Sequence, residues 1–172
     1  MTQSFLGRRG MAVAPHSLAA ESAVAVLREG GNAIEAMIAA AATIAVVYPH
    51  MNSIGGDAFW VMRGPNGVAG GIDASGPSAA AASLSAYQAR GIRGAIPFRG
   101  GDAALTVAGT VGGWGLAHRV AASLGGRLPL SRLLSDAIWY ADQGIPVTAS
   151  QSLSTAEKLD ELRELTGFAQ TF

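Results

Sequence analysis

The sequence predicts one α/β domain, of the mixed α+β kind, over residues 1–172. Three observations lead to this class. The chain is long enough to bury a core without disulfides or metals. One central segment is apolar on every side over the length of a helix, and two short apolar runs flank a strong hairpin signal. The predicted order is strand, helix, helix, strand, turn and strand, followed by further helices.

The central segment is residues 36–47, in which Thr43 is the only polar residue. About 20 apolar residues are needed to cross a bilayer, and this run is far shorter before Pro49 ends it. It therefore predicts a buried core helix covered on all sides rather than a membrane span. Asn32, followed three residues later by Glu35, has the pattern of a capping box that begins this helix.

Upstream of it, residues 11–14 form a short apolar run that predicts a strand buried on both faces. Ser17 follows and is expected to cap the first helix. The helix has apolar residues at i, i+3, i+4 and i+7, which predicts a single buried stripe. Its members are Ala20, Ala23, Val24 and Leu27.

The hairpin is predicted from two apolar runs, residues 58–62 and 68–72, on either side of Asn66-Gly67. Asn and Gly both tolerate positive φ, which the tightest hairpin turns require. After the hairpin, residues 75–85 are small and alanine-rich, and they predict a short helix ending near Gly91.

Residues 91–101 hold one proline, four glycines and two arginines, with Arg90 just before them. We expect an irregular loop there, either a solvated surface loop or, because of its length, a functional one. A helix over residues 114–124 should end at Gly125-Gly126. Ser131 is expected to cap the next helix, with Gly144 ending it. Its buried face is predicted to hold Leu134, Ala137, Ile138 and Ala141.

The last predicted helix begins at Ser154, which pairs with Glu157 as a capping box. It carries three leucines, Leu159, Leu162 and Leu165, among mostly charged residues, so it should lie at a surface.

Composition excludes several classes of function. Lys plus Arg and Asp plus Glu each number 12, and the longest basic cluster is Arg8-Arg9, so nucleic acid is not expected as a partner. With no cysteine, thiol catalysis and cysteine zinc sites are impossible. The first ten residues lack the apolar core of a signal peptide, so a cytoplasmic protein without membrane contact is expected. A periplasmic protein with a trimmed leader is the alternative.

No recognised nucleophile or metal motif is present. There is no Gly-x-Ser-x-Gly elbow, and His16, His50 and His118 lie in separate segments without the spacing of a triad. Histidines beside prolines more often fix turns than do chemistry. The same histidines with Asp57, Asp73 or Asp102 are not spaced as a metal site, so neither a metal nor another cofactor is expected.

Residues 109–113, Gly-Thr-Val-Gly-Gly, follow a predicted strand and open a helix. Free amides at such a place can bind phosphate. The segment is neither Gly-x-Gly-x-x-Gly nor a P-loop, and close packing of a helix against a strand explains its glycines as well.

Five stretches, in the family's order along the chain, resemble the large subunit of the gamma-glutamyltransferase (gamma-glutamyl transpeptidase) family. The fullest is Gly-Gly-Asn-Ala-Ile-Glu-Ala from residue 30, with the alanine-rich helix, Pro49-His50 and Ile-Gly-Gly-Asp-Ala-Phe from residue 54. Residues 10–16 resemble the family's opening strand and turn. The segment 107–113 is similar to its Gly-Thr-Val-x-Gly landmark, and Leu-Pro and Gly-(Phe/Tyr)-Pro-Val landmarks match residues 128–130 and 144–147.

The resemblance implies a piece of an N-terminal-nucleophile hydrolase with a four-layer αββα fold. Members are zymogens that cleave themselves autocatalytically, and glutathione metabolism is a typical role. The freed threonine of the small subunit is the nucleophile, and its own α-amine acts as base. No Thr-Thr-His-type motif occurs here, so no catalytic residue is expected in this chain, which would be the N-terminal portion of a large subunit. Its implied partners are a small-molecule amide substrate, the rest of the large subunit and the small catalytic subunit, and such heterodimers can form a homo-oligomer.

One family contact falls within this span. Gamma-glutamyl enzymes carry an arginine in an Ile-Asp-(Phe/Tyr)-Arg-Glu segment that binds the substrate α-carboxylate, a bidentate role suited to arginine. Here Ser75 stands at that place, after Ile72-Asp73-Ala74. The departure favours relatives that hydrolyse other amides, such as oxamate or glutaryl-type acyl groups. Ser75 and Gly76 are the candidate substrate-binding residues, as hydroxyl and amide donors, and a plain turn at a strand end is the alternative.

A second function class stays open. The missing nucleophile and Ser75 are also compatible with a non-catalytic, stand-alone binding or structural α/β module derived from the same fold. An isolated half of a layered fold would leave sheet edges and an apolar face uncovered, which disfavours this alternative.

Overall fold

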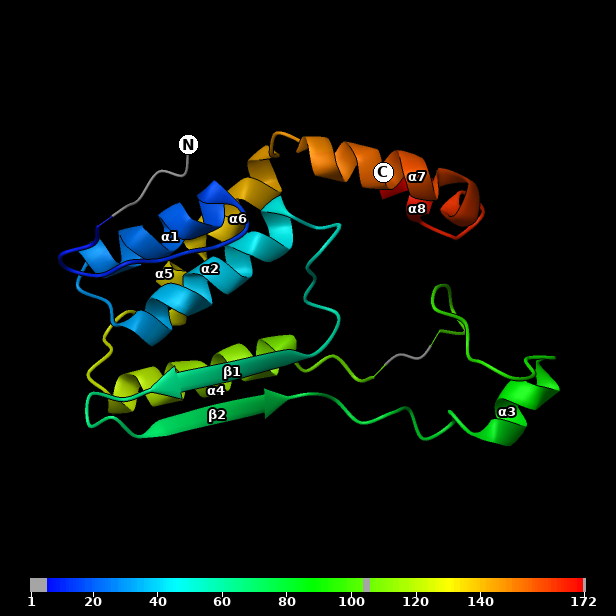
Figure 1. The fold of residues 1–172 in the computed structure, drawn as a ribbon, viewed down its shortest axis with the longest axis horizontal. Helices are drawn as coiled ribbons and strands as arrows, with labels where there is room; N and C mark the ends of the chain where they lie inside the picture. Colours follow the sequence, from blue (N-terminus) through cyan, green and yellow to red (C-terminus); the bar gives the residue numbers. More distant parts are fainter. Residues whose placement is uncertain (1–5, 104–105, 172) are drawn as a thin grey trace.

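The structure, a computed structural model, describes residues 6–103 and 106–171. Figure 1 shows a helical body beside a two-stranded sheet, with α3, α7 and α8 extending away from them. The elements in chain order are α1 (Ser17–Arg28), α2 (Ala33–Val47), β1 (Ala58–Arg63), β2 (Ala69–Ala74), α3 (Leu84–Ala89), α4 (Thr110–Ser123), α5 (Leu130–Leu133), α6 (Ser135–Gln143), α7 (Ala149–Leu162) and α8 (Phe168–Thr171).

Helix α2 is the centre of the fold, as predicted. It packs against α1, α4, α5 and α6, and Ile38 and Thr43 on it are fully buried. The predicted capping box is confirmed: the Asn32 side chain accepts from the amide of Glu35 at 3.0 Å, and the Glu35 carboxylate accepts from the amide of Asn32 at 2.7 Å. The expected cover is incomplete on one side, because Met37 is 43% exposed.

Strands β1 and β2 form the predicted antiparallel hairpin, with Trp60 opposite Ile72. Trp60 and Ile72 pack against the core cluster, and α4 lies against the same face of both strands (Figure 1). Of the two turn residues expected to tolerate positive φ, only Gly67 adopts it. Asn66 instead accepts the amide of Val68 with its side chain.

The N-terminal predictions need correction. Residues 11–14 are irregular chain rather than a strand, and Val13 is 77% exposed, because the described residues give this run no second strand or layer to cover it. The cap of α1 is His16, whose Nδ1 accepts the amide of Leu18 at 3.2 Å, rather than Ser17. The fully buried stripe of α1 shares only Ala23 with the predicted one and consists of Ala19, Ser22, Ala23 and Val26.

Helix boundaries after residue 75 were predicted less well. The short helix is α3, capped by Ser83, and the residues before it are irregular. Pro129 and not Ser131 precedes α5, and a separate helix α6 follows it and ends at Gly144, as expected, with φ 83°. On its predicted buried face Ala137 is buried, but Ile138 is 55% exposed.

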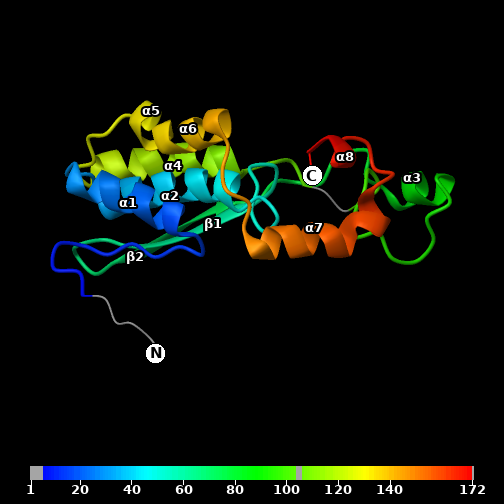
Figure 2. The same cartoon turned by 90° about the horizontal axis from the view of Figure 1, so that it is seen from above.

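Helix α7 begins at the cap Thr148, whose side chain accepts the amide of Gln151, so the expected start at Ser154 is wrong. An ion pair between Arg99 and Glu161 joins the irregular segment before α4 to α7, which lies away from the helical body (Figure 2). Leu159 is 43% exposed, which confirms the predicted surface position. None of the helices in the described ranges has the length and apolar character to span a bilayer.

Candidate functional site

Three segments meet at one end of the hairpin. They are residues 56–57 before β1, residues 73–76 at the end of β2, and residues 106–110, which lead into α4. Both residues predicted to bind substrate, Ser75 and Gly76, lie here. The meeting follows from the antiparallel pairing, because Ala58 at the start of β1 is opposite Ala74 at the end of β2.

Ser75 closes a tight turn on Asp73. Its amide and its hydroxyl both donate to Oδ1 of Asp73, at 2.9 and 2.6 Å. The hydroxyl bond, and then the amide bond, hold the pKa of the Asp73 carboxyl below its ordinary value. The hydroxyl proton of Ser75 is therefore engaged, while its oxygen keeps lone pairs that can accept a hydrogen bond.

Gly76 is fastened to Asp57. The amide of Gly76 donates to Oδ1 of Asp57 at 3.1 Å, and the hydroxyl of Thr106 donates to the same oxygen at 2.8 Å. A side chain at residue 76 would collide with the backbone, since its Cβ atom would lie 1.6 Å from the carbonyl oxygen of Val107. Only glycine fits this approach of the two segments.

The carbonyl oxygen of Gly56 completes the junction. It accepts the amides of Gly109 and Thr110, each at 3.0 Å, and the Thr110 hydroxyl at 2.7 Å. These bonds use amides at the start of α4 that the phosphate hypothesis needed. A Cβ on Gly109 would lie 2.0 Å from the carbonyl oxygen of Ala74, so close packing accounts for this glycine.

The three histidines make structural contacts in different places. His16 caps α1, His118 bonds through Nε2 to the carbonyl oxygen of Leu128 at 2.9 Å, and His50 lies 3.3 Å from the hydroxyl of Ser150. Asp102 pairs with Arg90. Within residues 6–103 and 106–171 no three His, Asp or Glu side chains are grouped as a metal site.

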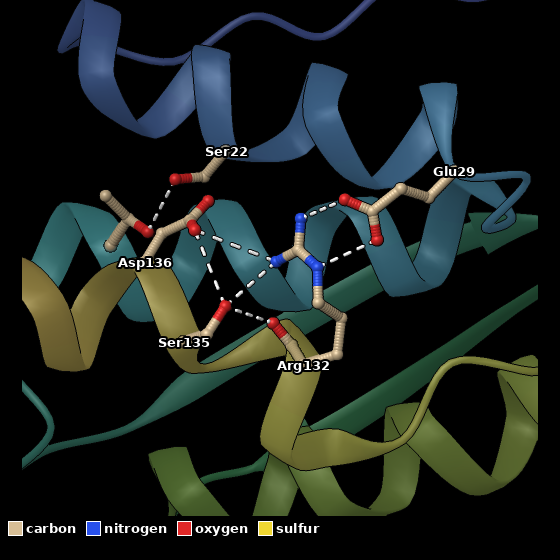
Figure 3. Close-up of polar contacts among 6 residues, drawn as sticks. Ser22, Glu29, Arg132, Ser135 and Asp136 are labelled. Atoms are coloured by element: carbon tan, nitrogen blue, oxygen red, sulfur yellow. Dashed lines mark hydrogen bonds and ion pairs between the residues drawn. The ribbon is translucent and has the colours of Figure 1, made fainter.

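A second polar cluster lies between α1 and the α5–α6 corner (Figure 3). Arg132 binds both carboxylate oxygens of Glu29 and also contacts Ser135 and Asp136. The hydrogen bond from Arg132 lowers the pKa of Glu29. Every charge in it has a partner, so we interpret this cluster as a clasp between helices rather than a site.

Sequence reasoning missed the roles of Asp57 and Thr106. In the sequence, Asp57 lacks the spacing of a metal ligand and has no other indicated role, and nothing indicates a role for Thr106. The available signal was an aspartate directly after Gly55-Gly56 at the start of a strand, but its partners lie 19 and 49 residues further along the chain. A short polar side chain at a strand start does not by itself indicate where such partners are.

The gamma-glutamyltranspeptidase family model matches residues 19–172. The chain is 58% identical over its whole length to an oxamate amidohydrolase proenzyme of Klebsiella pneumoniae, covering 32% of that protein. It is 37% identical over 94% of its length to a glutathione hydrolase-like proenzyme, YwrD, of Bacillus subtilis, covering 30% of it. The chain thus spans about a third of the length of these curated relatives.

Among solved structures, the Helicobacter pylori gamma-glutamyltranspeptidase superposes on 99% of the chain with a TM-score of 0.87 and 28% identity, and 48% of that protein is covered. Cephalosporin acylase from Bacillus halodurans superposes on 85% with a TM-score of 0.74 and 34% identity, covering 26% of that protein. The predicted relationship and the N-terminal-nucleophile hydrolase fold are confirmed. By its sequence and its fold, the chain belongs to the gamma-glutamyltranspeptidase family.

Proposed function

We propose that this chain is the N-terminal segment of the large subunit of a self-processing amidohydrolase. The nucleophile is a threonine outside these 172 residues, freed when the proenzyme cleaves itself, and its α-amine takes the proton of its own hydroxyl. The rest of the large subunit and a small catalytic subunit complete the enzyme, and heterodimers of this kind can assemble further. Family membership and the proenzyme names of the relatives support this proposal.

We further propose a small amide of the oxamate type as substrate. The observation that carries this is the closed turn at the end of β2, where Ser75 binds Asp73 in place of an arginine. A gamma-glutamyl group has its α-carboxylate three carbons beyond the scissile carbonyl, where a guanidinium can bind it. In oxamate the carboxylate is attached to the scissile carbonyl carbon itself, so a cation at residue 75 has no counterpart to bind.

Ser75 and Gly76 are the substrate-binding residues in this proposal. Because the Ser75 proton is held by Asp73, the residue offers its oxygen as an acceptor, and the N–H groups of a primary amide are suitable donors. Gly76 sets the position of the turn: its amide, expected from the sequence to be a donor to substrate, is bound by Asp57, and the Val107 carbonyl oxygen occupies the place of a side chain.

The test is to express the full-length protein and examine its processing and its substrates. We expect two polypeptides by intact mass, the second beginning with threonine. We also expect the enzyme to release ammonia from oxamate far faster than it releases the aniline from a chromogenic gamma-glutamyl anilide. Replacing that threonine by alanine should leave one uncleaved, inactive chain. A single stable, inactive wild-type polypeptide would instead support the alternative of a non-catalytic binding module.

Ser75→Arg, compared with Ser75→Ala, tests the substrate assignment. We expect Ser75→Arg to lower oxamate kcat/KM by tenfold or more, about 1.4 kcal/mol, because it removes the hydroxyl that binds Asp73 and places a long cationic side chain at the proposed substrate site. Ser75→Ala should cost less, since it removes one hydroxyl. Equal oxamate kinetics in all three proteins would exclude residue 75 from the substrate site.

A further inference from the structure

We infer that Asp57 is a positioning residue for the substrate site, one that fixes the Ser75–Gly76 turn without touching substrate. This inference rests on the proposed function and deepens it. The geometry is specific: a single carboxylate oxygen, Oδ1, accepts both the Gly76 amide at 3.1 Å and the Thr106 hydroxyl at 2.8 Å.

The two donors belong to segments that have little else to hold them. Gly76 lies two residues beyond the end of β2, and Thr106 precedes α4 by four residues. Between them the described residues form one isolated antiparallel bridge, from Ser78 to Thr106, which includes the bond from the Val107 amide to the Pro77 carbonyl oxygen at 2.9 Å. Asp57 therefore supplies two of the few bonds that set how residues 75–76 sit against residues 106–107.

Asp57 is itself held in place by its neighbours. The carbonyl oxygen of Gly56 is the acceptor for the start of α4, and Ala58 begins the paired strand β1. Because the backbone on both sides of Asp57 is fixed, its short side chain holds the turn at a defined place relative to β1 and α4. Loss of such a support permits shifts on the order of 1 Å, which reduce catalysis by about a hundredfold when they misplace substrate.

The two carboxylates at this end act on different residues. Asp73 closes the turn internally through Ser75, whereas Asp57 ties the turn to the rest of the fold. Removing the Asp57 bonds should leave the turn formed but displaced. Substrate binding should then suffer more than the chemical step, which depends on the threonine outside this chain.

The experiment uses the full-length, processed enzyme with Asp57→Ala, Asp57→Asn and Thr106→Val, and Asp142→Ala as a control. Asp142 is an exposed carboxylate on α6, so its loss matches the charge change away from the site. Because an asparagine Oδ1 accepts the same two hydrogen bonds without the charge, Asp57→Asn should restore what Asp57→Ala loses.

We expect Asp57→Ala to raise KM for oxamate about tenfold with a smaller fall in kcat. Thr106→Val should raise KM about threefold, and the KM of Asp57→Asn should stay within about threefold of the wild-type value. Hydrogen exchange of a peptide containing Gly76 should quicken in Asp57→Ala and not in Asp57→Asn. Asp142→Ala should match wild type in both measurements.

Wild-type kinetics in Asp57→Ala would overturn the inference. Equal losses in Asp57→Asn and Asp57→Ala, with Gly76 exchange unchanged in Asp57→Asn, would also overturn it, because the charge rather than the position would then matter. If the wild-type enzyme itself does not release ammonia from oxamate, the proposed substrate fails. The exchange measurement still decides the role of Asp57 in that case, since it needs no activity.

Discussion

Helix α2 and strand β1 of the hairpin both have mostly apolar sequences, but their surroundings are very different. Four helices pack around α2, and Ile38 on it is fully buried. The hairpin has α4 against one face only (Figure 1), and on its other face Phe59 is 69% and Val61 92% exposed. In β1, burial alternates residue by residue although nearly every residue is apolar.

The difference shows which face of the hairpin the described residues leave uncovered. A strand that is apolar on both faces suits a sheet with a layer on each side. The described residues supply one layer, the helices. In the proposed enzyme the remaining two-thirds of the protein supplies the second, as the four-layer αββα arrangement of the family implies.

The largest expected effects compare the two regions directly. In the full-length protein, Ile38→Ala should lower the free energy of unfolding by about 2–5 kcal/mol, because it leaves a cavity in a closed core. Val61→Ala should cost about 1–3 kcal/mol in the same protein if a second layer covers the hairpin. Urea denaturation of the three proteins measures both values.

An uncovered hairpin gives a different pattern. Val61→Ala would then stay within about 0.5 kcal/mol of wild type, as most surface substitutions do, while Ile38→Ala would be as damaging as before. Val61→Thr, which keeps a β-branched side chain at the same position, is the matched control for strand propensity.

Glu35 tests how α2 is fixed at its N-terminal end. Its carboxylate is fully buried and accepts the amides of Asn32 and Leu128, each at 2.7 Å. Glu35→Ala should lower the free energy of unfolding by about 2–4 kcal/mol, because two donors lose their partner. Glu35→Gln keeps one acceptor oxygen and should cost less. Equal, small losses in both variants would show that water replaces the carboxylate there.

Local signals were predictable from the sequence, and distant pairings were not. The capping box at Asn32 involves residues three apart, and the hairpin turn is a four-residue signal, so both could be found. The bond from Glu35 to Leu128 spans 93 residues and depends on how α2 meets the segment after α4. The burial of Ser22 in α1 was missed for the same reason, since its partner Thr43 is on another helix.

The candidate site follows the same rule. Ser75 was found because its place in a motif could be compared with the family's arginine, and its bond to Asp73 is only two residues long. The contribution of Asp57 needed the structure, because it depends on β2 and the segment before α4 converging on the start of β1.

A smaller effect is expected for the buried hydrogen bond between α1 and α2. The Thr43 hydroxyl donates to the Ser22 hydroxyl at 3.0 Å, and both residues are buried. Thr43→Val should cost about 1 kcal/mol. In a double-mutant cycle with Ser22→Ala, the two losses should be less than additive, since either substitution breaks the same bond. Strict additivity would mean that the two hydroxyls are stabilised separately.

The smallest expected effect concerns pH and the clasp on α1. The pKa of Glu29 is lowered in the folded protein, chiefly by its hydrogen bond with Arg132, and is ordinary in the unfolded chain. The clasp therefore contributes fully above the ordinary glutamate pKa and is lost as pH falls through the lower, folded value. Because the Glu29 side chain is 41% exposed, solvent screening limits the contribution to about 0.5 kcal/mol.

Glu29→Gln should remove the loss of folding stability that protonation of Glu29 causes at low pH. Glu157→Gln, at an exposed position on α7, should not. Urea midpoints measured between about pH 6 and the acid limit of folding give the comparison, with salt added to one series. The difference between the two variants should shrink in salt, because screening acts on exposed pairs. A salt-independent difference would instead indicate that Glu29 and Arg132 are covered from solvent in the full-length protein.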